Sequence, residues 1–261
     1  MYLSQRVRQV LTIEPSSIAI ITDSDSLPWK YVATFAAELS NVVASLRPTT
    51  GLSIGLIARN RAPHLAAIAA CLANEDCLVT LSPMFSDSAL ATDIATLGLH
   101  VIMGVREDLD RPGVTEAALS TGAAVIEISE EPDHPLFIIR DLVPNAEFRV
   151  RSGVAIEMLS SGTTGAPKRI SLTYENVEAA MGPAAPRSAR DASSELKVQS
   201  RPALVWLPIV HISGAYFVIE AIYSARPTIL MERFSAERWT EYVERFEVRL
   251  AHLNPAAMRM M

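Results

Sequence analysis

The feature that most constrains the fold of this chain is an alternation between short apolar segments and amphipathic ones. Apolar or β-branched segments typical of buried strands occur at 17–22, 53–58, 77–82, 100–105, 124–129, 203–208, 228–231 and 248–253. Between the first two, apolar residues recur at helical spacing over 32–46 and predict a helix with one buried face. The alternation of strand and helix predicts an α/β fold with a largely parallel sheet layered with helices.

The length of the chain and one irregular segment predict its domain organisation. At 261 residues the chain lies at the upper limit for one hydrophobic core, so we expect one large domain or two closely packed subdomains. Residues 183–200 are rich in Pro, Ala, Ser and Arg without a hydrophobic period, and predict a linker. We therefore divide the chain into a first α/β subdomain at 1–182, the linker, and the start of a second, similar subdomain at 201–261.

Composition argues against several partners. The net charge is −6 with no cluster of Lys and Arg, so we expect no nucleic-acid partner. Mean hydropathy is +0.22, but no apolar segment approaches the roughly 18 residues of a membrane helix and no leader pattern opens the chain. We expect a cytoplasmic protein without a membrane span.

Cys71 and Cys77 lack histidines at ligand spacing and predict two buried thiols and no metal site.

Two helical patterns follow the predicted strand at 228–231. Ser235 is a suitable N-cap for a helix that places Trp239, Tyr242, Val243 and Phe246 on one face. An aromatic stripe at this spacing is typical of core packing rather than of a cofactor site. Further on, Asn254-Pro255 is a typical opening for another helix over 256–261.

One segment carries chemical information: Ser160-Ser161-Gly162-Thr163-Thr164-Gly165-Ala166-Pro167-Lys168. Four hydroxyls, two glycines that let backbone N–H groups approach closely, and one ammonium make a donor set for a polyphosphate. The chain has only three lysines among 23 basic residues, so a lysine at this place is informative. The segment is not a Walker A loop, because Pro167 precedes the lysine and Arg169 follows it.

The residues after the loop predict its structural context. Ile170, Leu172 and Tyr174 alternate with polar residues, which indicates a strand, and a helix begins only near 173–176. The pattern is therefore strand, loop, strand. The alternative is a polar surface hairpin, but at about 7% per residue a match this long arises by chance in far fewer than one chain in ~10⁴. We predict a nucleotide-phosphate loop.

The loop resembles the phosphate-loop signature of the acyl-adenylate-forming superfamily, which includes acyl-CoA synthetases, nonribosomal peptide synthetase adenylation domains and luciferases. Residues 51–60, 66–73 and 81–83 are similar to the family's first conserved block, and 208–214 resemble its Pro-x-x-His-x-x-Gly block. The resemblance extends from about residue 10 to the end of the sequence. It implies the α/β fold of the N-terminal domain of these enzymes.

The resemblance also implies roles for individual residues. The residues that would bind the β- and γ-phosphates of ATP, with Mg²⁺ sharing the charge, are Ser160, Ser161, Gly162, Thr163, Thr164, Gly165 and Lys168. Of these, Lys168 and Thr163 would also be catalytic, because they stabilise the charge on the leaving pyrophosphate. His211 and Gly214 would lie beside the acyl substrate, although a lone histidine next to an apolar strand is often structural.

The function that the resemblance implies is a ligase of carboxylic acids. A small carboxylic acid and ATP would give acyl-AMP and pyrophosphate, and CoA or a carrier-protein thiol would then form a thioester. We expect the amino-terminal portion of such an enzyme, inactive alone, with an open sheet edge that favours a downstream domain or self-association. The alternative is a stand-alone, non-catalytic remnant that binds nucleotide or a partner subunit. The sequence identifies neither the acid nor the thiol acceptor.

Two departures from the family pattern leave questions for the structure. Arg169 stands where the family commonly has a small residue, so the second strand starts differently or the loop gains an extra cation. Residues 74–76, Asn-Glu-Asp, replace small residues before the strand at 77–82, which leaves the geometry of that turn open.

Overall fold

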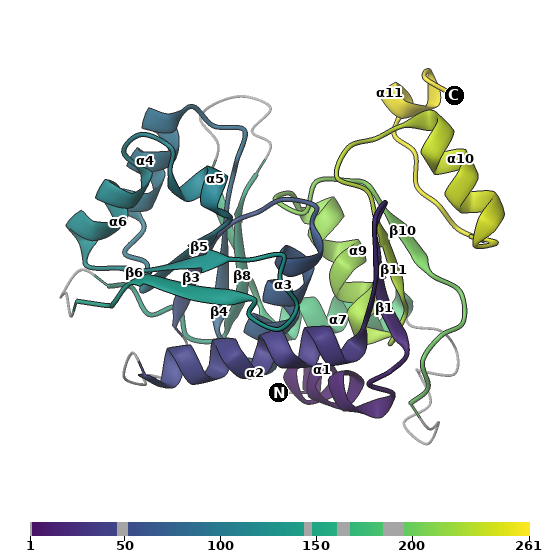
Figure 1. The fold of residues 1–261 in the computed structure, drawn as a ribbon, viewed down its shortest axis with the longest axis horizontal. Helices are drawn as coiled ribbons and strands as arrows, with labels where there is room; N and C mark the ends of the chain where they lie inside the picture. The colour runs from purple at the N-terminus through teal and green to yellow at the C-terminus, as the bar shows by residue number, and fades with distance from the viewer. Residues whose placement is uncertain (1, 46–51, 144–147, 161–167, 185–195) are drawn as a thin grey trace.

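The computed structural model describes residues 2–45, 52–143, 148–160, 168–184 and 196–261. Figure 1 shows two sheets with helices between them and on their outer sides. This is the mixed α/β architecture, with mostly parallel strands layered by helices, that the sequence predicts.

The larger sheet has seven strands in the order β7-β6-β5-β3-β4-β8-β9. These are β3 (Ser53–Ile57), β4 (Cys77–Leu81), β5 (Val101–Gly104), β6 (Ala124–Ile128), β7 (Leu136–Arg140), β8 (Val154–Leu159) and β9 (Arg169–Thr173). The five inner strands are parallel, and β7 and β9 are antiparallel edge strands. Every residue of β3 and β4 is buried, as expected for parallel strands covered on both faces.

The smaller sheet has four strands in the order β10-β11-β1-β2. Its strands are β1 (Ile18–Ile21), β2 (Ser26–Pro28), β10 (Ala203–Val205) and β11 (Thr228–Leu230). Since β1 pairs in parallel with β11, this sheet joins the start of the chain to residues beyond 200. β10 is an edge strand of this sheet, and the idea that its edge attracts a partner stays a prediction. The division at 182 and 201 also stays a prediction.

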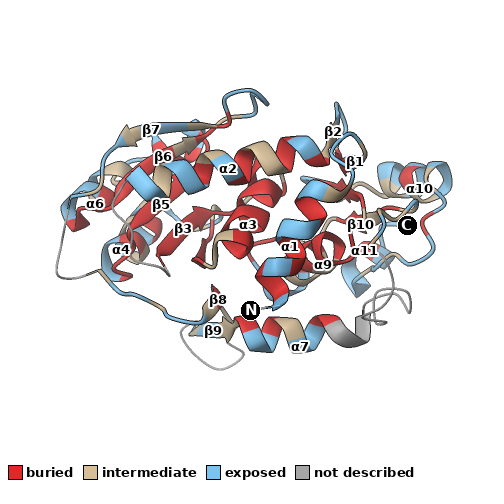
Figure 2. Ribbon diagram, turned by 90° about the horizontal axis from the view of Figure 1, so that it is seen from below, coloured by how far each residue is buried: buried red, intermediate tan, exposed pale blue. Residues whose placement is uncertain are grey.

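Helices form three layers around these sheets. The main core lies between the sheets and includes α1 (Tyr2–Ile13), α2 (Trp29–Ser45), α3 (Ala62–Asn74), α7 (Tyr174–Ala184) and α9 (Ile212–Tyr223). A second core packs α4 (Asp87–Thr96), α5 (Arg106–Leu109) and α6 (Val114–Thr121) on the outer face of the large sheet. A third packs α10 (Ala236–Arg245) on the small sheet, and α11 (Pro255–Met258) follows it. Figure 2 shows α3 buried at the centre.

The sequence predicts most of these helices from local pattern. The predicted helix at 32–46 is α2, whose residues Val32, Phe35 and Leu39 are buried in the main core. Ser235 is the N-cap of α10 and accepts a hydrogen bond from the Arg238 N–H. Tyr242 is buried among the partly buried members of the aromatic stripe, so this stripe is core packing, as predicted.

One predicted strand is wrong. Residues 248–253 follow α10 as irregular backbone, and Leu250 is 71% exposed. A strand needs a neighbouring strand to satisfy its backbone groups. Here the backbone carbonyl of His252 instead accepts a hydrogen bond from the Trp206 indole at 2.6 Å. Conversely, β2 and β7 are strands that the sequence pattern did not predict, since β2 has only three residues and β7 leaves Phe137 and Ile138 exposed.

The turn at 74–76 has a defined geometry. Glu75 adopts the left-handed conformation with φ of 65°, where glycine is usual, and it ends α3. Asp76 is buried, and one of its carboxylate oxygens accepts a hydrogen bond from the Leu52 N–H at 3.2 Å. The left-handed backbone at Glu75 therefore ends the helix, and the Asp76 carboxylate bonds the residue just before β3.

The two cysteines are free and buried, as predicted. Burial raises the pKa of the Cys77 thiol to about 12, so at neutral pH this thiol is protonated and a poor nucleophile. Throughout the described ranges, no helix is both long enough and apolar enough to cross a membrane.

Candidate functional site

The predicted phosphate loop joins the two strands of an edge hairpin. β8 and β9 pair in antiparallel register from Val154 with Thr173 to Leu159 with Arg169. The segment is therefore flanked by a strand on each side, as the sequence predicts. Residues 161–167 lie outside the described part of the chain, and with them the predicted ligands Ser161, Gly162, Thr163, Thr164 and Gly165. Of the predicted loop ligands, the structure describes Ser160 and Lys168.

Ser160 and Lys168 close the neck of the loop with two hydrogen bonds. The Ser160 N–H donates to the Lys168 carbonyl at 2.8 Å, and the Lys168 N–H donates to the Ser160 hydroxyl oxygen at 3.3 Å. Because this oxygen acts as acceptor, the hydroxyl proton stays available to another acceptor. The Lys168 residue is exposed. The neck thus presents one hydroxyl donor and one ammonium on the same edge of the sheet.

Arg169 links the hairpin to helix α4 and to strand β4. Its guanidinium forms an ion pair with Asp93 of α4 and donates to the Thr80 carbonyl of β4 at 3.3 Å. The side chains of Arg169 and Asp93 are only 15% and 17% exposed. Of the two alternatives that the sequence left open, an extra loop cation is therefore not favoured, because a carboxylate already neutralises this guanidinium.

A second ion pair lies further down the same hairpin. Glu157 of β8 is buried and accepts a hydrogen bond from Arg151 at 2.8 Å and another from the Ser171 hydroxyl of β9 at 3.3 Å. Arg151 also donates to the Leu97 carbonyl at 2.9 Å. Side-chain hydrogen bonds therefore stabilise this hairpin in addition to the backbone hydrogen bonds between β8 and β9.

Thr80 brings the two predicted site segments together. This buried residue of β4 accepts the hydrogen bond from Arg169, beside the loop, and its hydroxyl donates to the Val210 carbonyl at 3.3 Å. Val210 directly precedes His211. The carboxyl end of β4 therefore connects the base of the predicted phosphate loop to the predicted acyl-binding segment, which lies 130 residues from Thr80 in sequence.

His211 and Gly214 lie at the start of α9. His211 is the N-cap residue, is exposed, and donates its backbone N–H to the Pro208 carbonyl at 3.0 Å. A Cβ at Gly214 would lie 2.3 Å from the Pro208 oxygen and 2.5 Å from the Leu207 oxygen. Gly214 therefore allows the helix to approach the preceding turn closely, and contact of either residue with substrate stays a prediction.

Asn60 is a site-forming residue that the sequence did not single out. It is buried after β3, and its amide nitrogen donates to the carbonyls of Leu207 and Met231 at 3.0 and 3.1 Å. Its amide oxygen accepts from the Ile209 N–H at 2.9 Å. A polar residue near the carboxyl end of a buried strand is the signal that could have found both Asn60, three residues after β3, and Thr80, within β4.

The described residues supply no ready-made metal centre. Within the described ranges no group of three or more His, Cys, Asp or Glu side chains could hold an ion.

Solved structures share this fold over nearly the whole chain. The inhibitor-bound N-terminal domain of FACL13 from Mycobacterium tuberculosis aligns with a TM-score of 0.73 and 18% identity, over 99% of this chain and 64% of that one. O-succinylbenzoate coenzyme A synthetase from Bacillus subtilis, in complex with AMP, aligns with a TM-score of 0.70 and 18% identity, over 93% and 59%. At this identity the likeness defines the class of fold, the N-terminal domain of acyl-adenylate-forming enzymes.

Sequence comparison then defines the family. The profile of the AMP-binding enzyme family matches residues 7–261. The chain belongs to the AMP-binding enzyme family. It is 31% identical over 127 residues to 4-coumarate–CoA ligase-like 5 from Oryza sativa subsp. japonica and 33% identical over 146 residues to 4-coumarate–CoA ligase-like 6 from Arabidopsis thaliana. These matches cover 47% and 51% of this chain but only 23% and 25% of the lengths of the relatives.

Proposed function

We propose that this chain supplies the phosphate loop and part of the acyl site of an ATP-dependent carboxylic acid ligase. The observation that carries the proposal is the hairpin neck, where Ser160 and Lys168 are joined on either side of the loop sequence. The junction at Thr80 supports it, because it connects this neck to the segment of His211. Family membership supports the reaction class.

The loop residues act on the leaving group in the proposed first step. A carboxylate oxygen of the acid attacks the α-phosphorus of ATP, the bond from that phosphorus to the bridging oxygen breaks, and pyrophosphate leaves. The Lys168 ammonium and the hydroxyls of Ser160 and Thr163 stabilise the charge that collects on pyrophosphate. Mg²⁺, held by phosphate oxygens, would supply further positive charge. Losing one such donor costs about 10²-fold in rate.

The second step transfers the acyl group to a thiol. The thiolate sulfur attacks the acyl carbon, a thioester bond forms, and AMP leaves. We favour CoA over a carrier-protein thiol, because the curated relatives are named as CoA ligase-like proteins. His211 and Gly214 border the acyl group in this proposal. We also assign the protein to the cytoplasm.

Binding of pyrophosphate tests the role of the loop directly. We expect Lys168→Ala to weaken the affinity for magnesium pyrophosphate about tenfold in titration calorimetry, because one charge-assisted contact is lost. Lys30→Ala is the control, since Lys30 is an exposed lysine on α2. Equal affinities of the Lys168→Ala variant and the parent chain would show that Lys168 does not bind pyrophosphate.

Pyrophosphate exchange separates a ligase from a binding protein. We expect the 261-residue chain to give no exchange above blank with a broad set of carboxylic acids, and downstream sequence supplied in cis or in trans to restore it. Robust exchange by the isolated chain would contradict this expectation. Binding of pyrophosphate with no exchange under either condition would favour the non-catalytic alternative.

A further inference from the structure

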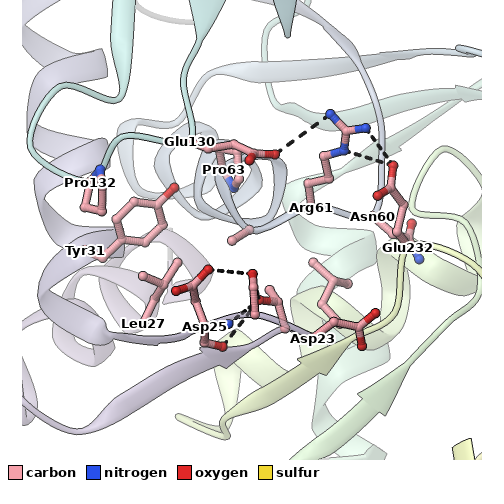
Figure 3. Close-up of a pocket in the computed structure, with 14 residues that line it drawn as sticks. Asp23, Asp25, Leu27, Tyr31, Asn60, Arg61, Pro63, Glu130, Pro132 and Glu232 are labelled. Carbon is pink, nitrogen blue, oxygen red and sulfur yellow. Dashed lines mark hydrogen bonds and ion pairs between the residues drawn. The ribbon is translucent and has the colours of Figure 1, made fainter. Parts of the chain in front are cut away.

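A cavity of about 370 Å³ lies between the carboxyl ends of the two sheets (Figure 3). Residues at or beyond the carboxyl ends of β1, β3, β6 and β11 line it, together with Leu27 and Tyr31. Neither the neck of the predicted phosphate loop nor His211 borders this cavity. Its volume is in the range of small-molecule sites, and it lies at the strand ends where α/β proteins bind ligands.

The mouth of this cavity is acidic. Four carboxylates border it, those of Asp23, Asp25, Glu130 and Glu232, against one guanidinium, that of Arg61. Glu232 is bound by Arg61 at 2.9 Å, whereas Glu130 is 3.9 Å from the same group. Arg61 also binds a carboxylate outside the cavity at 3.1 Å, so its charge is shared among several acids.

Charge balance leaves two of these acids without a close cation. Asp23 is neutralised from α10 by Arg238 at 2.7 Å. Asp25 receives the Ser24 hydroxyl at 2.6 Å and has no ion pair with any described residue. Glu130 has only the distant contact to Arg61. The uncompensated negative charge of the cavity therefore belongs to Asp25 and Glu130.

Tyr31 gives an independent indication of a ligand. This residue of α2 is only 4% exposed and lines the cavity, yet its hydroxyl has no hydrogen-bond partner among the described residues. Figure 3 shows the hydroxyl turned toward the side of the cavity where Glu130 lies. Burial, and then the charge of Glu130, raise the pKa of Tyr31, so the group stays protonated. A buried hydroxyl without a partner is destabilising, and a bound polar group would satisfy it.

We propose that this cavity binds a primary alkylammonium ion. An ammonium carries three N–H donors, and Asp25, Glu130 and Tyr31 line the cavity with side chains that each have an acceptor oxygen. Its alkyl stem would contact the apolar wall that Leu27 and Pro132 provide. The described residues hold no group of three acids or histidines arranged for a metal ion, which favours an organic cation.

Titration with n-butylammonium tests the proposal on the 261-residue chain without ATP. NMR titration at low salt is expected to show saturable binding of n-butylammonium and none of n-butanol, its neutral counterpart. Asp25→Asn and Glu130→Gln should each weaken binding about tenfold, and Tyr31→Phe about fivefold, because each removes a partner of the ammonium. The control Glu131→Gln, at an exposed position beside Glu130 that does not line the cavity, should stay within about twofold of the parent.

Thermal unfolding shows whether the Tyr31→Phe variant keeps the stability of the parent, so that a change in binding can be interpreted. Without ligand, Tyr31→Phe should keep or raise the melting temperature, since it removes only an unpartnered hydroxyl. Three results would overturn the proposal: equal binding of n-butylammonium and n-butanol, the same affinity in all four variants, or displacement of n-butylammonium by Mg²⁺ that binds more tightly.

Discussion

The side-chain amide oxygen of Asn60 accepts a hydrogen bond from the backbone N–H of Ile209 at 2.9 Å. Asn60 follows a strand of the large sheet, and Ile209 follows a strand of the small one. The amide nitrogen of Asn60 donates to two further backbone carbonyls of the same region. One buried side chain therefore holds the turn before His211 against the end of β3.

Asn60→Ala should destabilise the protein by about 3 kcal/mol, because it leaves a buried N–H and two carbonyls without this partner. Urea unfolding of variant and parent measures the change. Asn41→Ala, at an exposed position of α2, is the matched control and should shift the free energy of unfolding by less than about 0.5 kcal/mol. A similarly small shift at Asn60 would mean that the turn before His211 is held by other contacts.

Gly214→Ala should destabilise the protein by about 2 kcal/mol or more, against the normal trend for helices. Alanine usually gains about 1 kcal/mol over glycine inside a helix. Here its Cβ would lie 2.3 Å from the Pro208 oxygen, so helix and turn must separate. Ser213→Ala, one residue earlier and exposed, should be close to neutral in the same thermal unfolding experiment. Stabilisation by Gly214→Ala would contradict the close approach.

Arg169 and Asp93 should be energetically coupled. A double-mutant cycle with Arg169→Met and Asp93→Asn is expected to give a coupling energy of about 1–2 kcal/mol, since the pair is largely buried. The exposed pair Arg245 and Glu241 is the comparison, with about 0.5 kcal/mol or less. Raising the salt concentration should reduce the exposed coupling more than the buried one. Equal couplings in the two cycles would show that Arg169 does not anchor the hairpin.

Asp76 should make the protein less stable as the pH rises from about 4 to about 7. Burial raises the pKa of this carboxyl to about 7, partly offset by the hydrogen bond from Leu52, so the folded state binds the proton more tightly than the unfolded state. The stabilisation is present below the unfolded pKa, about 4, and disappears as pH rises through the folded pKa. The Asp76→Asn variant has no titratable carboxyl at this position, so it should not lose stability in this way as the pH rises.

The stability of Asp76→Asn relative to the parent should therefore increase by roughly 1.4 kcal/mol per pH unit at most between these limits. Urea unfolding at several pH values between 4.5 and 7.5 measures the difference, in which contributions from other groups cancel. A difference that does not change with pH would mean that Asp76 titrates normally in the folded protein.

Local pattern was enough to predict the main strands and helices of the fold. The period of apolar residues predicted β3, β4 and α2, because a buried strand or one buried helix face depends mainly on residues close in sequence. The hydroxyls, glycines and lysine from Ser160 to Lys168 also lie within one short segment, so the sequence alone predicts a phosphate loop there, and this role stays a prediction.

Only the tertiary structure decided which distant residues meet. The pairing of β1 with β11 and the hydrogen bonds of Thr80 with Val210 and of Asn60 with Ile209 join positions more than 100 residues apart, and no local period encodes such pairs. The same limit explains the wrong strand at 248–253: its pattern was suitable, but a strand forms only where another strand can satisfy its backbone, and Trp206 meets this segment instead. Local chemistry determined which segments form strands and helices, and long-range hydrogen bonding determined their partners.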